Sequence, residues 1–154
     1  MKTKIGMTVL MLLTAALAFA QNGLNTVKPV ISDQDLVINI DEITENALFY
    51  PVDIGGTRVE VLAVKAPDGT IRTAFNTCQS CYRSGRGFYK QQGTVLVCQN
   101  CGKRFRMSQV EVRSGGCSPV PIFKDDKTVS GNTITISQEY LAKARDIFAR
   151  WKRT

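Results

Sequence analysis

Two Cys-x-x-Cys pairs and a fifth cysteine, in a chain of 154 residues without histidine, constrain the fold more than any other feature of this sequence. The pairs are Cys78 with Cys81 and Cys98 with Cys101, and the fifth cysteine is Cys117. Each pair brings two sulfurs onto one tight turn, and the 16 residues between Cys81 and Cys98 allow both turns to face one ion or cluster. Tetrahedral sulfur ligation selects zinc or iron over magnesium or calcium. The spacing therefore predicts a thiolate metal site formed by both pairs.

Other interpretations of the cysteines stay open. Paired cysteines in exported proteins usually form structural disulfides, although five cysteines leave one unpaired. A thioredoxin-like redox centre is disfavoured, because the Tyr-Arg-Ser-Gly-Arg-Gly sequence after Cys81 does not readily begin a helix. Cys117 follows Gly115-Gly116 and precedes Pro119, a rigid loop that favours placing its sulfur at the site. This fifth thiol can replace a ligand, bind a second metal, act as a redox handle or simply pack as a buried thiol.

Residues 1–20 have the pattern of a secretory signal peptide. Lys2 and Lys4 precede an apolar run over residues 5–19, and Ala18-Phe19-Ala20 fits a small-x-small cleavage site. The alternative is a short uncleaved anchor, but the run is shorter than the ~20 residues that span a bilayer. We therefore expect export to a periplasmic or extracytoplasmic membrane-associated location.

The mature sequence predicts one domain with a basic surface. Residues 21–35 indicate a flexible lead, and residues 36–154 are long enough for a single compact domain. The formal charge of +7 falls to +5 when Lys2 and Lys4 are removed. Export disfavours nucleic acid as a partner. Anionic lipid headgroups or an acidic partner protein are expected instead, with a merely solvated basic face as the alternative.

The residue pattern predicts an α+β fold made mainly of antiparallel β-hairpins. Residues 58–66 and 70–75 are β-rich runs joined by Pro67-Asp68-Gly69, where proline presets a turn and glycine accepts positive φ. Further strands are expected at residues 36–40, 49–53, 94–97, 128–131 and 133–136. Each cysteine pair directly follows one of these runs. We therefore expect two cysteine knuckles at strand ends.

One amphipathic helix is predicted at the C-terminus. Ser137 is a suitable N-cap, with Glu139 in the first turn. Apolar residues then recur at spacings of three and four: Tyr140, Leu141, Ala144, Ile147, Phe148 and Trp151. Such a stripe is typical of core packing rather than of a cofactor site.

Glycines near both pairs support the knuckle interpretation. Gly102 follows Cys101 and permits the turn in which backbone N–H groups point at sulfur. The first pair has no adjacent glycine, but Gly85 and Gly87 lie close behind and can serve the same close approach. Basic residues around the pairs are suited to offset thiolate charge: Arg83, Arg86, Lys103, Arg104 and Arg106. Aromatic residues flank them and are expected to wall the core: Phe75, Tyr82, Phe88, Tyr89 and Phe105.

Longer stretches of sequence around the cysteines resemble a known family. They are Ala74-Phe75-Asn76-Thr77-Cys78-Gln79-Ser80-Cys81, Gly87-Phe88-Tyr89, Val97-Cys98-Gln99-Asn100-Cys101-Gly102, Phe105 and Gly115-Gly116-Cys117-Ser118-Pro119-Val120-Pro121-Ile122. Residues 36–123 are similar to the FtrD-like family of membrane iron-sulfur proteins (DUF2318). The resemblance implies an iron-sulfur assignment and a link to bacterial iron uptake, with a membrane iron-uptake or electron-transfer partner. The family's cysteine positions fall on Cys78, Cys81, Cys98, Cys101 and Cys117. Larger members have a multi-span membrane portion, and we expect this sequence to correspond to their soluble module alone.

Together these observations predict an exported, cysteine-ligated metal protein that serves electron transfer or metal handling. Cys78, Cys81, Cys98 and Cys101 are the expected ligands of an iron-sulfur cluster, with zinc as the alternative metal. A zinc-ribbon-like binding module and a disulfide-stapled exported domain are the alternative functions. A stand-alone enzyme is not expected. The chain has no histidine base, no phosphate loop and no paired-carboxylate constellation.

Overall fold

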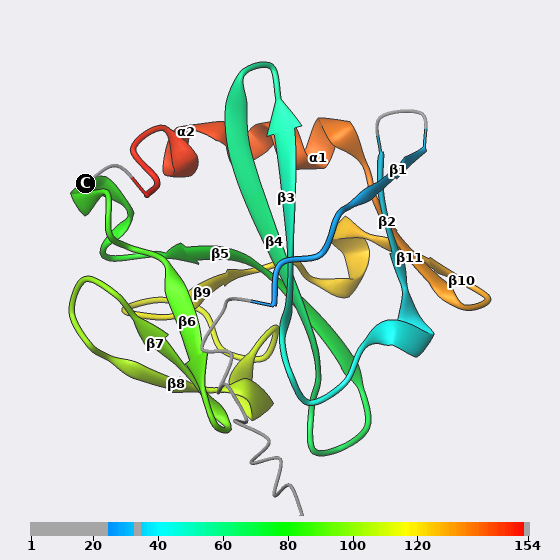
Figure 1. Ribbon diagram of the computed structural model, residues 1–154, viewed down its shortest axis with the longest axis horizontal. Coiled ribbons are helices and arrows are strands. Elements are labelled where there is room, and N and C mark those ends of the chain that lie inside the picture. Colours follow the sequence, from blue (N-terminus) through cyan, green and yellow to red (C-terminus); the bar gives the residue numbers. More distant parts are fainter. Residues whose placement is uncertain (1–24, 33–34, 153–154) are drawn as a thin grey trace, which may run out of the picture.

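The computed structural model describes residues 25–32 and 35–152, and their strands form three antiparallel sheets (Figure 1). The central sheet has the order β3-β4-β5-β9, with bounds Leu48–Ile54, Thr57–Lys65, Ile71–Cys78 and Pro119–Pro121. The second has the order β1-β2-β11-β10, with bounds Val30–Ser32, Asp35–Asn39, Thr133–Ile136 and Thr128–Ser130. The third has the order β6-β7-β8, with bounds Tyr89–Gln92, Val95–Cys98 and Arg104–Arg106. The helices are α1 (Gln138–Lys143) and α2 (Arg145–Phe148), and single 3-10 turns occupy Ile40–Glu42, Tyr82–Ser84, Met107–Gln109 and Lys124–Asp126.

Strand β4 runs through the middle of the molecule and is buried on both faces. Its side chains alternate between two separate apolar clusters, as the two-residue period of a strand requires. Val59, Val61 and Ala63 enter the first cluster, whereas Leu62 and Val64 enter the second. The continuous apolar run of β4 therefore divides the interior into two cores.

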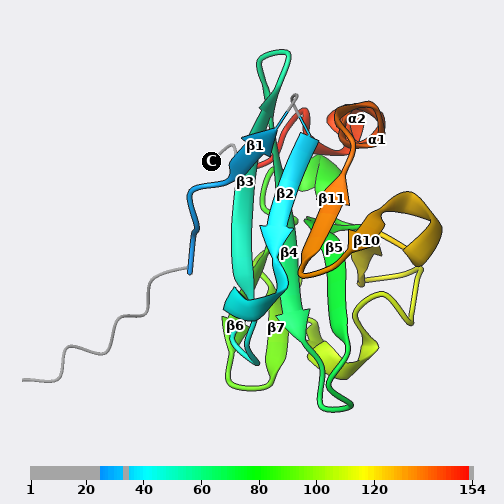
Figure 2. The same ribbon diagram turned by 90° about the vertical axis from the view of Figure 1, so that its right-hand side faces the viewer.

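The first core lies between the central sheet, the β1-β2-β11-β10 sheet and the C-terminal helices. Leu36 and Ile38 of β2 and Ile134 and Ile136 of β11 are buried in it. Phe75 of β5 stacks on Tyr140 at a centroid distance of 5.8 Å. Figure 2 shows β2 and β11 side by side in front of the central strands. This core contains none of the five cysteines.

The second core lies between the opposite face of the central sheet and the small β6-β7-β8 sheet. Phe49 and Leu62 of the central sheet pack with Leu96 of β7 and Phe105 of β8. Three cysteines, Cys78, Cys81 and Cys98, are counted among its buried members, and Cys117 packs against it. The cysteine site is therefore continuous with an apolar core rather than attached to its surface.

The predicted β-rich architecture is confirmed, and each expected strand has a counterpart within a few residues of the predicted bounds. The expected turns are present, with positive φ at Gly69 (83°) and Gly131 (53°). Strands β1, β6, β8 and β9 were not predicted. They are three or four residues long, too short for an alternating pattern to stand out.

The C-terminal segment is two short helices instead of the one predicted. Ser137 caps α1 as expected, accepting a hydrogen bond from the Tyr140 backbone N–H at 3.2 Å. The α-helix is interrupted at Ala144, whose ψ is −5°. Leu141 and Phe148 are nevertheless buried in the first core, so the apolar stripe has the predicted packing role despite the break.

The N-terminal expectations fall largely outside the described residues, which exclude the proposed signal peptide over 1–20. Within the segment interpreted as a flexible lead, Val30–Ser32 forms β1 and pairs with β2. The Val27 N–H also donates to the Phe49 carbonyl at 2.9 Å. Within 25–32 and 35–152, no helix has the length and apolar character required to cross a membrane.

Candidate metal centre

The five cysteines come from three separate segments of the chain. Cys78 is the last residue of β5, and Cys81 follows it at the start of a 3-10 turn. Cys98 is the last residue of β7, and Cys101 lies in the turn that leads to β8. Cys117 lies in the loop before β9, which pairs with β5 close to Cys78. The fold therefore brings both pairs and the fifth cysteine to one end of the second core.

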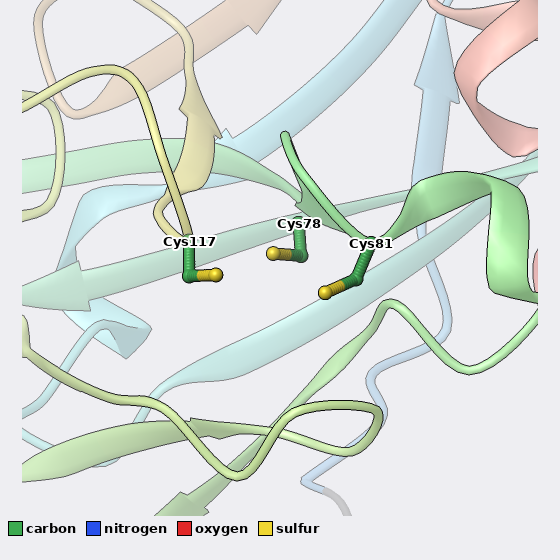
Figure 3. A group of neighbouring side chains, drawn as sticks. All are labelled: Cys78, Cys81 and Cys117. Carbon is green, nitrogen blue, oxygen red and sulfur yellow. The ribbon is translucent and has the colours of Figure 1, made fainter.

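The cysteine sulfurs form one connected cluster centred on Cys81. The Sγ atoms of Cys78, Cys81 and Cys117 lie within 4.8 Å of one another, and so do those of Cys81, Cys98 and Cys101. The Sγ atoms of Cys101 and Cys117 are 3.6 Å apart. Figure 3 shows the side chains of the first group directed toward one another. For comparison, a tetrahedral ion with ~2.3 Å bonds to sulfur separates its ligand atoms by about 3.8 Å.

Burial differs across the cluster. The side chains of Cys78, Cys81 and Cys98 are buried, that of Cys117 is half-buried and that of Cys101 is exposed. All five are free thiols. A metal bound here would have a protected side facing the core and an accessible side at Cys101.

Backbone hydrogen bonds hold both cysteine turns. In the first turn, the Cys81 N–H donates to the Cys78 carbonyl at 3.1 Å. In the second, the Gly102 N–H donates to the Cys98 carbonyl at 2.9 Å, and Gly102 has the positive φ of 71° expected from its position. The first hydrogen bond joins residues three apart and the second joins residues four apart, so the two turns differ in length.

Gly87 allows the segment that leads into β6 to approach the first pair. Its carbonyl accepts a hydrogen bond from the Cys78 N–H at 2.7 Å. A Cβ atom at this position would lie 2.4 Å from the carbonyl carbon of Cys81. Gly87 thus permits a close approach between two backbone segments at the first pair, whereas the predicted approach of backbone N–H groups to sulfur stays a prediction.

Gln79 ties the Cys117 loop to the first pair, a role that sequence reasoning missed. Its Nε2 donates to Ser118 Oγ at 3.1 Å and to the Pro119 carbonyl at 3.2 Å. Its Oε1 accepts from the Gly115 N–H at 3.1 Å. The only sequence signal was a polar residue inside the first Cys-x-x-Cys pair, with nothing to indicate its distant partners.

The thiols have markedly different acidities. A backbone hydrogen bond from Lys103 is the main reason that the pKa of Cys101 is lowered to about 7. Burial raises the pKa of Cys81 to about 12 and that of Cys98 to about 11. The pKa of Cys117 is raised to about 11, mainly because this thiol is hydrogen-bonded to Cys101. Without a metal, Cys101 is therefore the thiol that ionises most readily of these four.

The stretch of the chain that contains the two cysteine pairs has only basic charged residues. No aspartate or glutamate occurs between Asp68 and Glu111. Exposed cations surround the two pairs there: Arg83, Arg86, Lys90, Lys103, Arg104 and Arg106. Thiolates bound to a divalent metal carry net negative charge, which nearby cations stabilise.

The aromatic residues near the cysteines divide between different environments. Tyr89 and Phe105 wall the second core as predicted. Phe75 instead lies in the first core, because it is on the opposite face of β5 from Cys78. Phe88 packs edge-on against Trp151, with 6.2 Å between the ring centroids.

Comparison with known proteins identifies one family. The model of the family described as "Membrane iron-sulfur containing protein FtrD-like" matches residues 43–148, which include all five cysteines. Neither the curated proteins nor the solved structures contain a match.

Proposed function

Since the chain belongs to the FtrD-like family, we propose that it is an exported protein whose cysteines hold an iron-sulfur cluster for electron transfer or metal handling during bacterial iron uptake. The observation that carries this proposal is the connected cluster of five thiols, three of them buried in an apolar core. Thiolates are the protein ligands of iron-sulfur clusters. The donor set therefore fits the group that the family name implies.

Cys78, Cys81, Cys98 and Cys101 would supply the four thiolates that such a cluster takes, with Cys117 within reach as a fifth. When bound, the cluster supplies one-electron chemistry. The protein's own residues exclude water on the core side and leave the Cys101 side accessible. We infer a binding and redox module rather than a stand-alone catalyst.

A single zinc ion is the second candidate, and the sulfur spacing supports it because it suits one tetrahedral ion. Cys81 lies within 4.8 Å of each other cysteine sulfur, close to the about 3.8 Å edge of one tetrahedral thiolate site. In that case the ion would be structural, and function would lie in the basic surface around the site.

The basic surface suggests the kind of partner. The exposed charged residues that flank both pairs in the sequence are all cationic, so a membrane-bound iron-uptake or electron-transfer protein with an acidic docking face fits them. An anionic membrane surface is the alternative, and nucleic acid is not expected for an exported chain. Binding of either partner would weaken with added salt.

The decisive test is elemental analysis with visible absorption on protein purified anaerobically from the exported fraction. Iron with acid-labile sulfide and a visible band that bleaches on reduction would support the cluster. One zinc per chain in a colourless protein would refute it in favour of the structural ion. Metal-free protein without free thiols would favour the disulfide-stapled alternative. A Cys98→Ser variant provides the matched loss-of-ligand control.

A further inference from the structure

Tyr89 occupies a fixed place between the two cysteine pairs. It is the first residue of β6 and lies opposite Cys98 in the pairing of β6 with β7. Its side chain is 0% exposed and belongs to the same core as Cys78, Cys81 and Cys98. It is among the largest fully buried side chains of the described residues.

A buried polar network fixes the backbone of Tyr89. Asn76 Oδ1 accepts from the Tyr89 N–H at 2.8 Å, and Asn76 Nδ2 donates to the Tyr89 carbonyl at 3.3 Å. The same Nδ2 donates to the buried carboxylate of Glu60 at 2.7 Å. Asn76 precedes Cys78 by two residues at the end of β5, where the pairing with β9 is irregular. The network therefore sets the position of Tyr89 relative to the first cysteine pair.

The hydroxyl of Tyr89 is buried and makes no hydrogen bond within the described residues. Tyr50 also has a buried hydroxyl without a partner, but it lies in the first core, away from the cysteines. What distinguishes Tyr89 is its neighbours. Cys98 is its cross-strand partner, and the Cys78 N–H donates to the carbonyl of Gly87, two residues before Tyr89, at 2.7 Å. The segment that carries Tyr89 therefore runs beside Cys78, and a phenolic hydroxyl is a hydrogen-bond donor.

We propose that Tyr89 is a positioning residue whose hydroxyl donates a hydrogen bond to the Cys78 sulfur once that sulfur is a metal-bound thiolate. This inference rests on the proposed function, because it requires a metal on the cysteines. A hydrogen bond to a metal-bound sulfur withdraws electron density and orients the ligand. The bond gives the orphaned hydroxyl a partner in the loaded protein and makes the loaded site more stable.

The test compares Tyr89→Phe with Tyr50→Phe, because each variant removes one buried, unpartnered hydroxyl and keeps the ring. Anaerobic Co²⁺ titration of the purified protein, in competition with a chelator, measures affinity and the sulfur-to-cobalt charge-transfer bands together. We expect Tyr89→Phe to bind Co²⁺ about 10- to 100-fold more weakly, the range for one hydrogen bond to a charged group, with shifted bands. Tyr50→Phe should match the wild type in both.

The outcomes separate the two proposals. Absence of Co²⁺ binding by the wild type would refute the metal site itself. Binding by the wild type with equal affinities and unshifted bands in both variants would overturn the role of Tyr89 alone. Should Tyr89→Phe fold poorly, NMR of the wild type decides. The Tyr89 hydroxyl proton must change its chemical shift when diamagnetic Cd²⁺ is added, and an unchanged shift in the loaded protein overturns the inference.

Discussion

Substitution of Gly87 by alanine tests whether close backbone approach builds the first cysteine turn. The new Cβ would lie 2.4 Å from the carbonyl carbon and oxygen of Cys81 and 2.7 Å from the backbone nitrogen of Tyr82. Carbon atoms pack at about 3.5–4.0 Å, so the two segments must separate by about 1 Å. That separation also breaks the 2.7 Å hydrogen bond from the Cys78 N–H to the Gly87 carbonyl.

The expected loss of stability follows from these two effects. Overpacking of a rigid interior costs about 1–3 kcal/mol, and one lost hydrogen bond adds about 1 kcal/mol. The free energy of unfolding should therefore fall by about 2–4 kcal/mol. At about 4 °C per kcal/mol for a domain of this size, the Tm should fall by roughly 8–16 °C. Metal affinity should fall as well, because Cys78 and Cys81 move with the turn.

Urea denaturation and Co²⁺ titration of the variant measure both effects, with Gly93→Ala as the matched control. Gly93 has a positive φ of 57°, and nothing lies within 4 Å of its Cβ position, so alanine there adds only backbone strain of about 1–2 kcal/mol. A Gly87→Ala protein that is as stable as the control and binds Co²⁺ like the wild type would refute the close-approach argument.

Further predictions concern the thiols and the buried polar network. In the reduced, metal-free protein, iodoacetamide should label Cys101 first, at a rate that rises through pH 7 and then levels off. The reason is that the backbone N–H of Lys103 lowers the pKa of this thiol to about 7. Peptide mass spectrometry across pH 6–9 measures the labelling rate, and a rate that rises around pH 9 instead would contradict the lowered pKa. Cys117→Ser should weaken Co²⁺ binding by at least about 10-fold if this thiol is a ligand, as its place among the sulfurs indicates, and unchanged affinity would exclude it. Lys152→Ala should lower the free energy of unfolding by about 1–3 kcal/mol, because Glu60 is 1% exposed and its contact with the ammonium is 3.4 Å. Urea denaturation checks this loss, and a change below about 0.5 kcal/mol would show that the pair behaves like an exposed one.

The β-rich fold could be predicted where local pattern and turn chemistry agreed. The β4–β5 hairpin is the clearest case, since two β-branched runs flank Pro67-Asp68-Gly69 and pair as expected. The split of the interior into two cores could not be predicted. The apolar run of β4 shows that both its faces are buried, but not which elements cover them, because those elements are distant in sequence.

The cysteines of the candidate site could be predicted from the sequence, but the side-chain contacts that hold them in place could not. The Cys-x-x-Cys spacing predicts that each pair shares a turn, and the structure places both pairs together. The link from Gln79 to the Cys117 loop spans 39 residues at Ser118. The contact of Asn76 with Tyr89 depends on how β5 meets β6. Such side-chain partners follow from the packed tertiary structure, which no local pattern encodes.

Because the cysteines lie inside the second core, a metal bound to them would also stabilise the fold at that end of the molecule. Three of the five thiols take positions that apolar side chains would otherwise fill, beside Leu62 and Leu96. The small β6-β7-β8 sheet therefore packs on a core made partly of sulfur, and a metal bound there would contribute free energy directly to that packing. The first core has its own aliphatic and aromatic side chains and contains no cysteine. Because β4 contributes to both cores, the first core gives the site a stable base, and a bound metal would act mainly on the β6-β7-β8 side of the fold.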